Sequence, residues 1–245
     1  MEKDKAILIE ELESKIADLE KEKASLLKVL SHDLRSPLNK LFALIGLFRM
    51  SDNALSDEQV IYLDKMELVI SDGLSKMRNL MELKAIEGDG FDVLYEPLNL
   101  GKTIGRVIKE YGSAIERKNF TIVFDEKSVV IETDKLSVQR ILDHLISNAI
   151  KYSPLGSKII VKIEDKVDDV AIQVIDGGYG ISEKEQENLF KKFVVLSTRV
   201  TGGESALGLG LFIAQSMAKN IGAIINYENR DGSTFILSLP KTRLA

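Results

Sequence analysis

Cysteine and tryptophan are absent from this chain of 245 residues, and histidine occurs only twice, at His32 and His144. Without cysteine there is no disulfide framework, no thiolate zinc site and no cysteine nucleophile. Two histidines are too few for most imidazole metal clusters. No apolar run approaches the ~18 to 20 residues that cross a bilayer, and the N-terminus lacks the apolar core of a signal peptide. We therefore expect a cytoplasmic chain.

An excess of positive charge is missing as well. The net charge is -5 and the isoelectric point is about 5.3. Nucleic-acid-binding domains usually carry a strongly basic patch, so this balance argues against a nucleic-acid partner. Apolar residues make up 44% of the chain and charged residues 29%. This composition is typical of a globular protein, and the length allows one large domain or two of ordinary size.

The first part of the chain carries a heptad pattern, in which apolar residues recur at alternating spacings of three and four and Lys23 interrupts one core position. The apolar positions are Ile9, Leu12, Ile16, Leu19, Leu26 and Leu30. This pattern predicts a coiled-coil signalling helix over residues 1–24. An amphipathic helix packed on its own domain is the alternative.

Two long helices joined by a short turn are expected over residues 25–87. The turn falls near residues 51–56, where Ser and Asp side chains favour turns and helix caps, and the second helix keeps a 3.6-residue apolar period over residues 57–87. Such a hairpin leaves an apolar face on each helix uncovered. We therefore expect a homodimer in which two hairpins form a four-helix bundle.

The periodicity breaks at residues 88–98, which contain Gly88, Gly90 and Pro97 and which we interpret as a linker. Residues 99–245 then alternate between helical and strand patterns. Helices are expected over residues 100–118, 135–152 and 209–221, and strands over residues 120–126, 128–133, 158–165, 170–176, 223–229 and 233–240. Hairpin turns are expected at Asp168–Asp169 and Asp231–Gly232. The fold class is therefore α+β, with mostly antiparallel strands and helices on one sheet face.

A first polar cluster lies in the helical segment DHLISNAIKYSP. His144, Asn148 and Lys151 occur at i, i+4 and i+7 and so share one helical face. An amide oxygen is a suitable ligand for Mg²⁺, and a lysine suits a phosphate. A solvated polar face is the alternative for this cluster taken alone.

A second cluster, IDGGYGIS, follows an apolar strand directly. Asp176 at the strand end can accept a hydrogen bond from an exocyclic amine, while Gly178 and Gly180 allow the backbone to approach a flat ring closely. A simple turn is the alternative for this segment by itself.

A third cluster, GGESALGLGLFIAQ, places Gly208 and Gly210 at the start of an apolar helix. Free backbone N–H groups and the positive end of the helix dipole favour phosphate there. Gly202 and Gly203 indicate a mobile loop before it. The spacing matches neither a Walker A sequence nor a dinucleotide fingerprint.

In this order and spacing, the three clusters make residues 135–218 resemble the ATP-binding domain of the histidine kinase and gyrase-type (GHKL) ATPase superfamily. The resemblance implies an α/β sandwich that binds ATP and Mg²⁺. It implies that Asn148 holds Mg²⁺, Lys151 meets phosphate and Tyr152 packs near the adenine. It also implies that Asp176 recognises adenine and that Gly178 and Gly180 line the base site. Gly208, Leu209 and Gly210 would form the phosphate end of a lid.

Two further features belong to the same resemblance. Phe190 and Phe193 resemble the aromatic box that opens the lid, and the resemblance implies that residues 191–207 are mobile until nucleotide binds. The chain departs from the family at His144, where the first asparagine of the helix motif is usual, and at Ala206, where the lid motif usually has glycine. The chain retains Asn148 as the implied metal ligand and Asp176 as the residue implied to recognise adenine.

The segment SHDLRSPL distinguishes between branches of the superfamily. Pro37 lies inside a helical pattern at a cost of about 3 kcal/mol, because it removes a hydrogen bond and clashes with the preceding turn. The segment resembles the phosphoacceptor box of a sensor histidine kinase. The resemblance implies that His32 attacks the γ-phosphate of ATP, with Asp33 orienting or deprotonating its ring. It places Ser36 where the family has a residue implicated in dephosphorylating a partner.

We therefore expect an ATP-dependent protein-histidine kinase core that is phosphorylated at His32 and passes the phosphoryl group to an aspartate of a response-regulator receiver domain. The upstream sensor module is expected outside this chain, which leaves open a membrane-anchored parent protein. The main alternative is a dimeric signalling scaffold with a degenerate nucleotide-binding domain. A chaperone-like or topoisomerase-like ATPase is a third possibility, but it does not explain SHDLRSPL.

Overall fold

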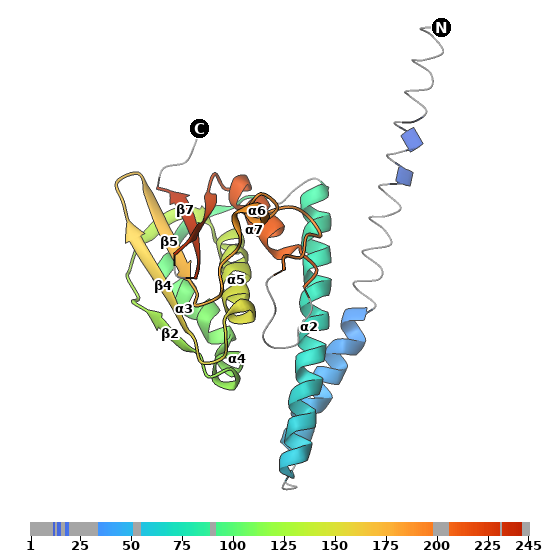
Figure 1. Cartoon of the computed structure of the whole chain (residues 1–245). Coiled ribbons are helices and arrows are strands. Elements are labelled where there is room, and N and C mark those ends of the chain that lie inside the picture. The colour runs from blue at the N-terminus through green and yellow to red at the C-terminus, as the bar shows by residue number, and fades with distance from the viewer. Residues whose placement is uncertain are drawn as a thin grey trace. The chain divides into compact units, whose positions relative to one another are not determined.

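The computed structural model describes residues 34–50, 55–88, 92–197, 206–230 and 232–241, together with residues 12, 14, 15, 18 and 19, which are helical (Figure 1). The chain divides into two compact units, Met1–Gly88 and Asp89–Ala245. The greater part of the expected coiled coil, and both His32 and Asp33, lie outside the described residues. Among the described residues, no helix combines the length and the hydropathy that a transmembrane span requires.

The first unit contains a helical hairpin, in which a helix over residues 34–49 lies alongside α2 (Asp57–Glu87) (Figure 1). Ser56 begins α2 through a capping box, because its hydroxyl accepts from the Gln59 N–H while the Gln59 side chain accepts from the Ser56 N–H. The two helices pack through Ile45, Leu63 and Ile70. The predicted second helix over residues 57–87 is thus confirmed.

The second unit is built on a five-stranded sheet. In sheet order its strands are β2 (Thr121–Phe124), β4 (Lys158–Asp165), β5 (Asp169–Ile175), β7 (Ser233–Pro240) and β6 (Ile224–Asn229). Only β2 and β4 pair in parallel, and the other neighbours are antiparallel. A separate antiparallel ribbon joins β1 (Tyr95–Asn99) to β3 (Val130–Asp134). The predicted α+β class with mostly antiparallel strands is confirmed.

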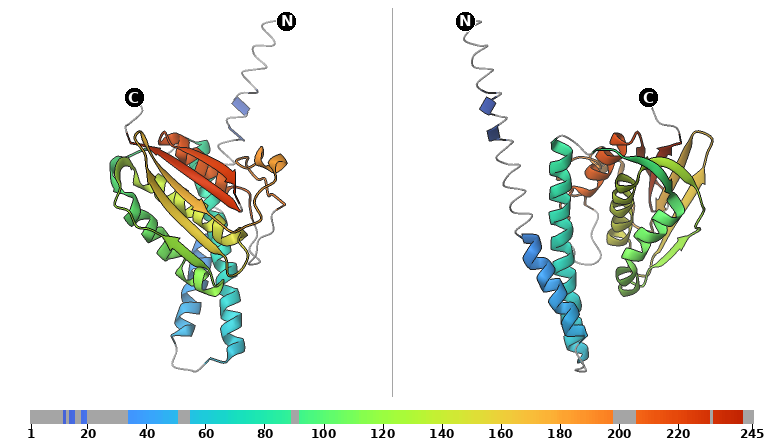
Figure 2. Two further views of the ribbon diagram at one scale, coloured as in Figure 1. Left: turned by 60° about the vertical axis from the view of Figure 1, so that its left-hand side comes forward. Right: turned by 180° about the vertical axis from the view of Figure 1, so that it is seen from behind.

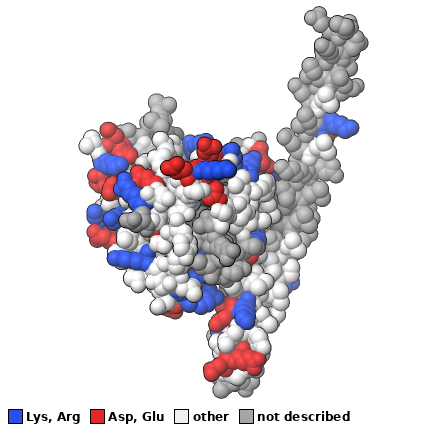
Figure 3. All heavy atoms as spheres, viewed as in Figure 1, with Lys and Arg blue, Asp and Glu red and all other residues white. Residues whose placement is uncertain are grey.

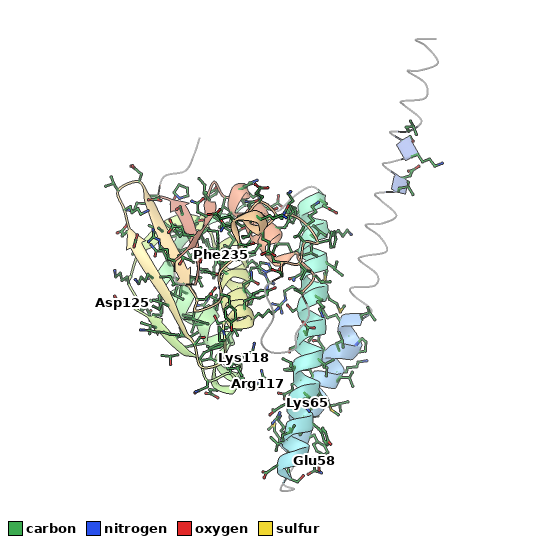
Figure 4. The ribbon with its side chains drawn as sticks, viewed as in Figure 1. Glu58, Lys65, Arg117, Lys118, Asp125 and Phe235 are labelled. Carbon is green, nitrogen blue, oxygen red and sulfur yellow. The ribbon has the colours of Figure 1, made fainter. Side chains whose placement is uncertain are left out.

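Helices cover one face of this sheet, as both views of Figure 2 show. The helices of the unit are α3 (Leu100–Glu110), α4 (Gly112–Arg117), α5 (Lys135–Tyr152), α6 (Glu183–Gln186) and α7 (Gly210–Asn220). In β4, Ile159, Val161 and Ile163 are buried, whereas Lys162 is exposed. This alternation is expected for a sheet with one face on a helical layer. Phe235 of β7, labelled in Figure 4, is also buried.

Three expectations need correction. The expected linker is shorter, because Tyr95–Asn99 pairs with β3 as β1. The helix expected over residues 100–118 is two helices, because α3 ends at Glu110, Tyr111 caps it, and α4 starts at Gly112. The first hairpin turn lies at residues 167–168, since the Lys166 N–H donates to the Asp169 carbonyl, and the second connection spans the three residues 230–232. Pairing across strands sets the end of the linker and the two connections, and the local sequence does not reveal that pairing.

Candidate nucleotide site

Helix α5 carries the first polar cluster and is fixed at both ends. Asp134 caps its start, where Oδ1 accepts from the Ser137 N–H at 2.7 Å. Near its C-terminal end, the buried Lys118 (labelled in Figure 4) donates from Nζ to the Ile150 carbonyl at 3.1 Å. A cation at this end of a helix is favourable because the last carbonyls carry partial negative charge. The helix is therefore a rigid support for its polar side chains.

The polar positions of α5 differ in exposure. His144 is buried, whereas Asn148, Lys151 and Tyr152 are half-buried. The described residues contain no group of three or more His, Asp and Glu side chains that could hold a metal ion. Asn148 offers an amide oxygen, a donor type that suits Mg²⁺.

Asp176 follows the last residue of β5 and is only 5% exposed. Its Oδ1 accepts from the Gly178 N–H at 2.8 Å and from the Ser233 N–H at 3.4 Å. Burial raises the pKa of this carboxyl from 3.8 to about 6, because desolvation outweighs the two backbone hydrogen bonds that lower it. The structure thus places a buried carboxylate at a strand end, as the sequence predicts.

The glycines after Asp176 are needed for close packing. A Cβ on Gly178 would lie 2.7 Å from Asp176 Oδ1 and 3.3 Å from the Tyr152 carbonyl oxygen at the end of α5. Gly180 has φ +72°, and a Cβ there would lie 2.5 Å from Asn229 Oδ1. These contacts fix the loop against α5 and β6, and side chains at either glycine would displace it.

The start of α7 contacts the middle of α5. A Cβ on Gly210, the first residue of α7, would lie 3.3 Å from Nδ1 of His144. Leu209 is fully buried and serves as N-cap without a side-chain hydrogen bond to the first turn. Such a turn presents backbone N–H groups and positive dipole to an anion.

Gly208 fixes the segment that precedes α7. Its φ is +67°, and a Cβ there would lie 2.4 Å from the Val194 carbonyl oxygen. The Phe193 N–H donates to the Gly208 carbonyl at 2.9 Å. Phe193 itself is exposed with φ +60°, whereas Phe190 is half-buried. Residues 198–205, which include Gly202 and Gly203, lie outside the described part of the chain.

The three clusters therefore meet along α5. The Asp176 loop contacts its C-terminal end at Tyr152, α7 contacts it at His144, and Asn148 lies between these two points. Ser36 is exposed on the helix of the first unit. Figure 3 shows positive and negative side chains interspersed on the visible face of the described residues.

Sequence reasoning missed the contribution of the connection between β6 and β7. The Ser233 N–H donates to Asp176, and the Asp176 N–H donates to the Ser233 carbonyl at 2.9 Å. A Cβ on Gly232 would lie 2.1 Å from the Asp176 carbonyl oxygen. Gly232 was visible in the sequence as a turn residue, but only the pairing of β5 with β7 brings it to Asp176.

Comparison with known proteins agrees with this arrangement. Residues 133–243 match the family described as histidine kinase-, DNA gyrase B- and HSP90-like ATPase. Sensor histidine kinase YcbM of Bacillus subtilis (strain 168) is 24% identical over 95% of this chain and 76% of its own length. The sensor kinase/phosphatase LuxQ of Vibrio vulnificus (strain YJ016) is 31% identical over 90% of this chain and 27% of its own length.

A solved structure covers both units. Histidine kinase ThkA, in complex with the response regulator TrrA, is 25% identical with a TM-score of 0.57, covering 91% of this chain and 64% of that chain. The second unit is therefore an ATP-binding domain of the histidine kinase, gyrase B and Hsp90 class. The chain belongs to the sensor histidine kinases. It spans about a quarter of the length of some of these relatives, LuxQ among them.

Proposed function

We propose that this chain is an ATP-dependent kinase core that phosphorylates His32 and transfers the phosphoryl group to a response regulator. The observation that carries the proposal is the convergence of the three clusters on α5, in a domain of the ATP-binding class. The segment SHDLRSPL supplies a histidine followed by an acidic residue in the hairpin unit. A nucleotide site alone would equally suit a scaffold, and the histidine box distinguishes the kinase.

The described residues fit ATP and Mg²⁺. Asp176 would accept from the exocyclic amine of adenine, and the missing side chain at Gly178 leaves backbone next to that carboxylate. The uncapped first turn of α7, starting at Gly210, would bind phosphate, with Lys151 as a further cation. Asn148 would hold Mg²⁺, which supplies charge neutralisation on the phosphates.

His32 and Asp33 lie outside the described residues, so their roles rest on the sequence motif. A neutral imidazole is a competent nucleophile near pH 7, and an adjacent carboxylate can hold the required tautomer. The imidazole nitrogen would form a bond to the γ-phosphorus while the bond to the leaving oxygen of ADP breaks. The other residues would position the two reactants, as phosphoryl transfer requires.

A homodimer accounts for the apolar surface of the hairpin. Leu44, Leu47 and Val69 are 60%, 65% and 71% exposed, although they lie on well-formed helices. Large apolar side chains exposed on both helices of a hairpin suit an interaction surface, and two hairpins would cover them as a four-helix bundle. The complex of ThkA with TrrA supports a response regulator as the second partner. Ser36 would act in dephosphorylating that partner, and the coiled coil would connect to an upstream sensor.

Incubation with γ-labelled ATP and Mg²⁺ tests the proposal. We expect label on the wild type, none on His32→Ala, and strongly reduced label on Asn148→Ala. Asn226→Ala, at an exposed position of β6, is the matched control and should be labelled like the wild type. Nucleotide binding without label would favour the degenerate scaffold, and phosphate release without a phosphoprotein would favour a simple ATPase.

A further inference from the structure

The two carboxyl oxygens of Asp176 have unequal surroundings. Oδ1 accepts from two backbone N–H groups, those of Gly178 and Ser233. Within the described part of the chain, no donor to Oδ2 is found, although the residue is only 5% exposed. Oδ2 is not among the described buried side-chain atoms that lack a partner, so this oxygen is accessible and can take a ligand donor or a proton.

Among the described residues, no charged side chain contributes to the raised pKa of Asp176. Titratable groups on the described segments that flank Asp176 include Lys151 and Tyr152 of α5, Lys158 of β4, Tyr179 of the loop and Arg230 of the connection between β6 and β7. The pKa of Asp176 is set by burial and the two backbone N–H groups, and none of these side chains is among its causes. The charge of Asp176 therefore responds to the occupant at Oδ2.

Purines differ in what they present to this oxygen. Adenine carries an amine at C6, which donates, whereas hypoxanthine and guanine carry a carbonyl there, which accepts. An ionised carboxylate can only accept, but a protonated one has an O–H to donate. Because Oδ1 already accepts two N–H groups, a proton on Asp176 would reside on Oδ2.

We propose that the charge of Asp176 sets the purine selectivity of the nucleotide site: the ionised carboxylate selects adenine, and the protonated carboxyl selects 6-oxopurines. The inference rests on the proposed function, because it requires that Asp176 faces the base. The loop packs closely here, because a Cβ on Gly178 would collide with Asp176 and a Cβ on Gly180 would collide with Asn229. The change from hydrogen-bond acceptor to donor therefore occurs at one atom, Oδ2 of Asp176.

The proposal predicts how the ratio of the Kd values for two nucleotides changes with pH. This slope does not depend on the value of the pKa of Asp176. ATP would bind the form with one proton fewer and inosine triphosphate the form with one proton more. The ratio of their Kd values then changes by up to about tenfold per pH unit, from proton linkage alone. Titration of the phosphates is common to both nucleotides and cancels in this ratio.

The experiment measures Kd for ATP and inosine triphosphate on the full chain between about pH 5.5 and pH 8.5, at constant Mg²⁺. We expect preference for ATP at high pH and a rising relative affinity for inosine triphosphate as the pH falls. Asp176→Asn should bind inosine triphosphate with no pH dependence of the ratio, because an amide can accept at Oδ1 and donate from Nδ2. Asp168→Asn, in an exposed turn, is the matched control and should keep the wild-type slope.

A constant ratio in the wild type would overturn the inference while leaving ATP binding intact. Absence of ATP binding at every pH would instead overturn the proposed function. If Asp176→Asn fails to fold, as judged by circular dichroism, the wild-type slope alone decides. A slope that persists in folded Asp176→Asn would also overturn the inference, because another group would then be responsible.

Discussion

Replacement of Gly208 by alanine tests the packing at the start of α7. Gly208 has φ +67°, and a Cβ there would lie 2.4 Å from the Val194 carbonyl oxygen. The left-handed conformation alone costs an L-residue about 1–2 kcal/mol. The collision adds a further cost of about 1–2 kcal/mol, at the lower end of typical overpacking. Gly208→Ala should therefore lose about 2–4 kcal/mol in all.

Gly156→Ala is the matched control for this variant. Gly156 has φ +76°, but nothing lies within 4 Å of the position of a Cβ. This variant therefore carries the conformational cost without the collision. It lies in the connection between α5 and β4, away from Val194 in the sequence.

Amide hydrogen exchange at Phe193 provides the assay, because its N–H donates to the Gly208 carbonyl. A loss of about 2–4 kcal/mol corresponds to exchange that is about 30- to 700-fold faster in Gly208→Ala. Gly156→Ala should leave the exchange of Phe193 unchanged. Equal protection of Phe193 in the two variants would refute the packing assigned to Gly208.

Single contacts elsewhere in the second unit lead to three more predictions. The pKa of Asp176 is higher in the folded state than in the unfolded state, so the stability associated with its protonated form is lost as pH rises through about 6. Asp176→Asn removes this loss. It should therefore increase the free energy of unfolding, measured in urea, by up to about 3 kcal/mol at pH 8 and by little at pH 4. Glu185 accepts from the Ser197 N–H, and hydrogen bonds from Ser182 and Ser197 lower its pKa to about 2. Glu185→Gln should speed hydrogen exchange of the Ser197 amide. The control Glu187→Gln should leave that exchange unchanged. Asp134→Ala removes the N-cap of α5 and should lower the free energy of unfolding by about 1–2 kcal/mol, measured by the same urea titration.

The sequence predicted most helices and strands because their patterns are local. The helix over residues 135–152 and the strand over residues 158–165 match α5 and β4. The break at Tyr111 and the strand β1 were missed. β1 contains Pro97 and follows two glycines, and it forms by pairing with β3, which no local pattern contains.

The site shows the same division between local and long-range information. Asn148, Asp176 and Gly210 could be selected because each lies in a short motif on an identifiable element. The role of Ser233 could not be predicted, because it depends on β7 lying beside β5. The contact of Gly210 with His144 likewise requires the packing of α7 on α5.

In the proposed kinase, the γ-phosphoryl group of ATP in the nucleotide site passes to His32. The most direct measurement is the chemical stability of the label after incubation with γ-labelled ATP and Mg²⁺. A phosphohistidine predicts label that survives alkali, is lost in acid and is absent from His32→Ala. Label that survives acid, or that persists in folded His32→Ala, would contradict the account.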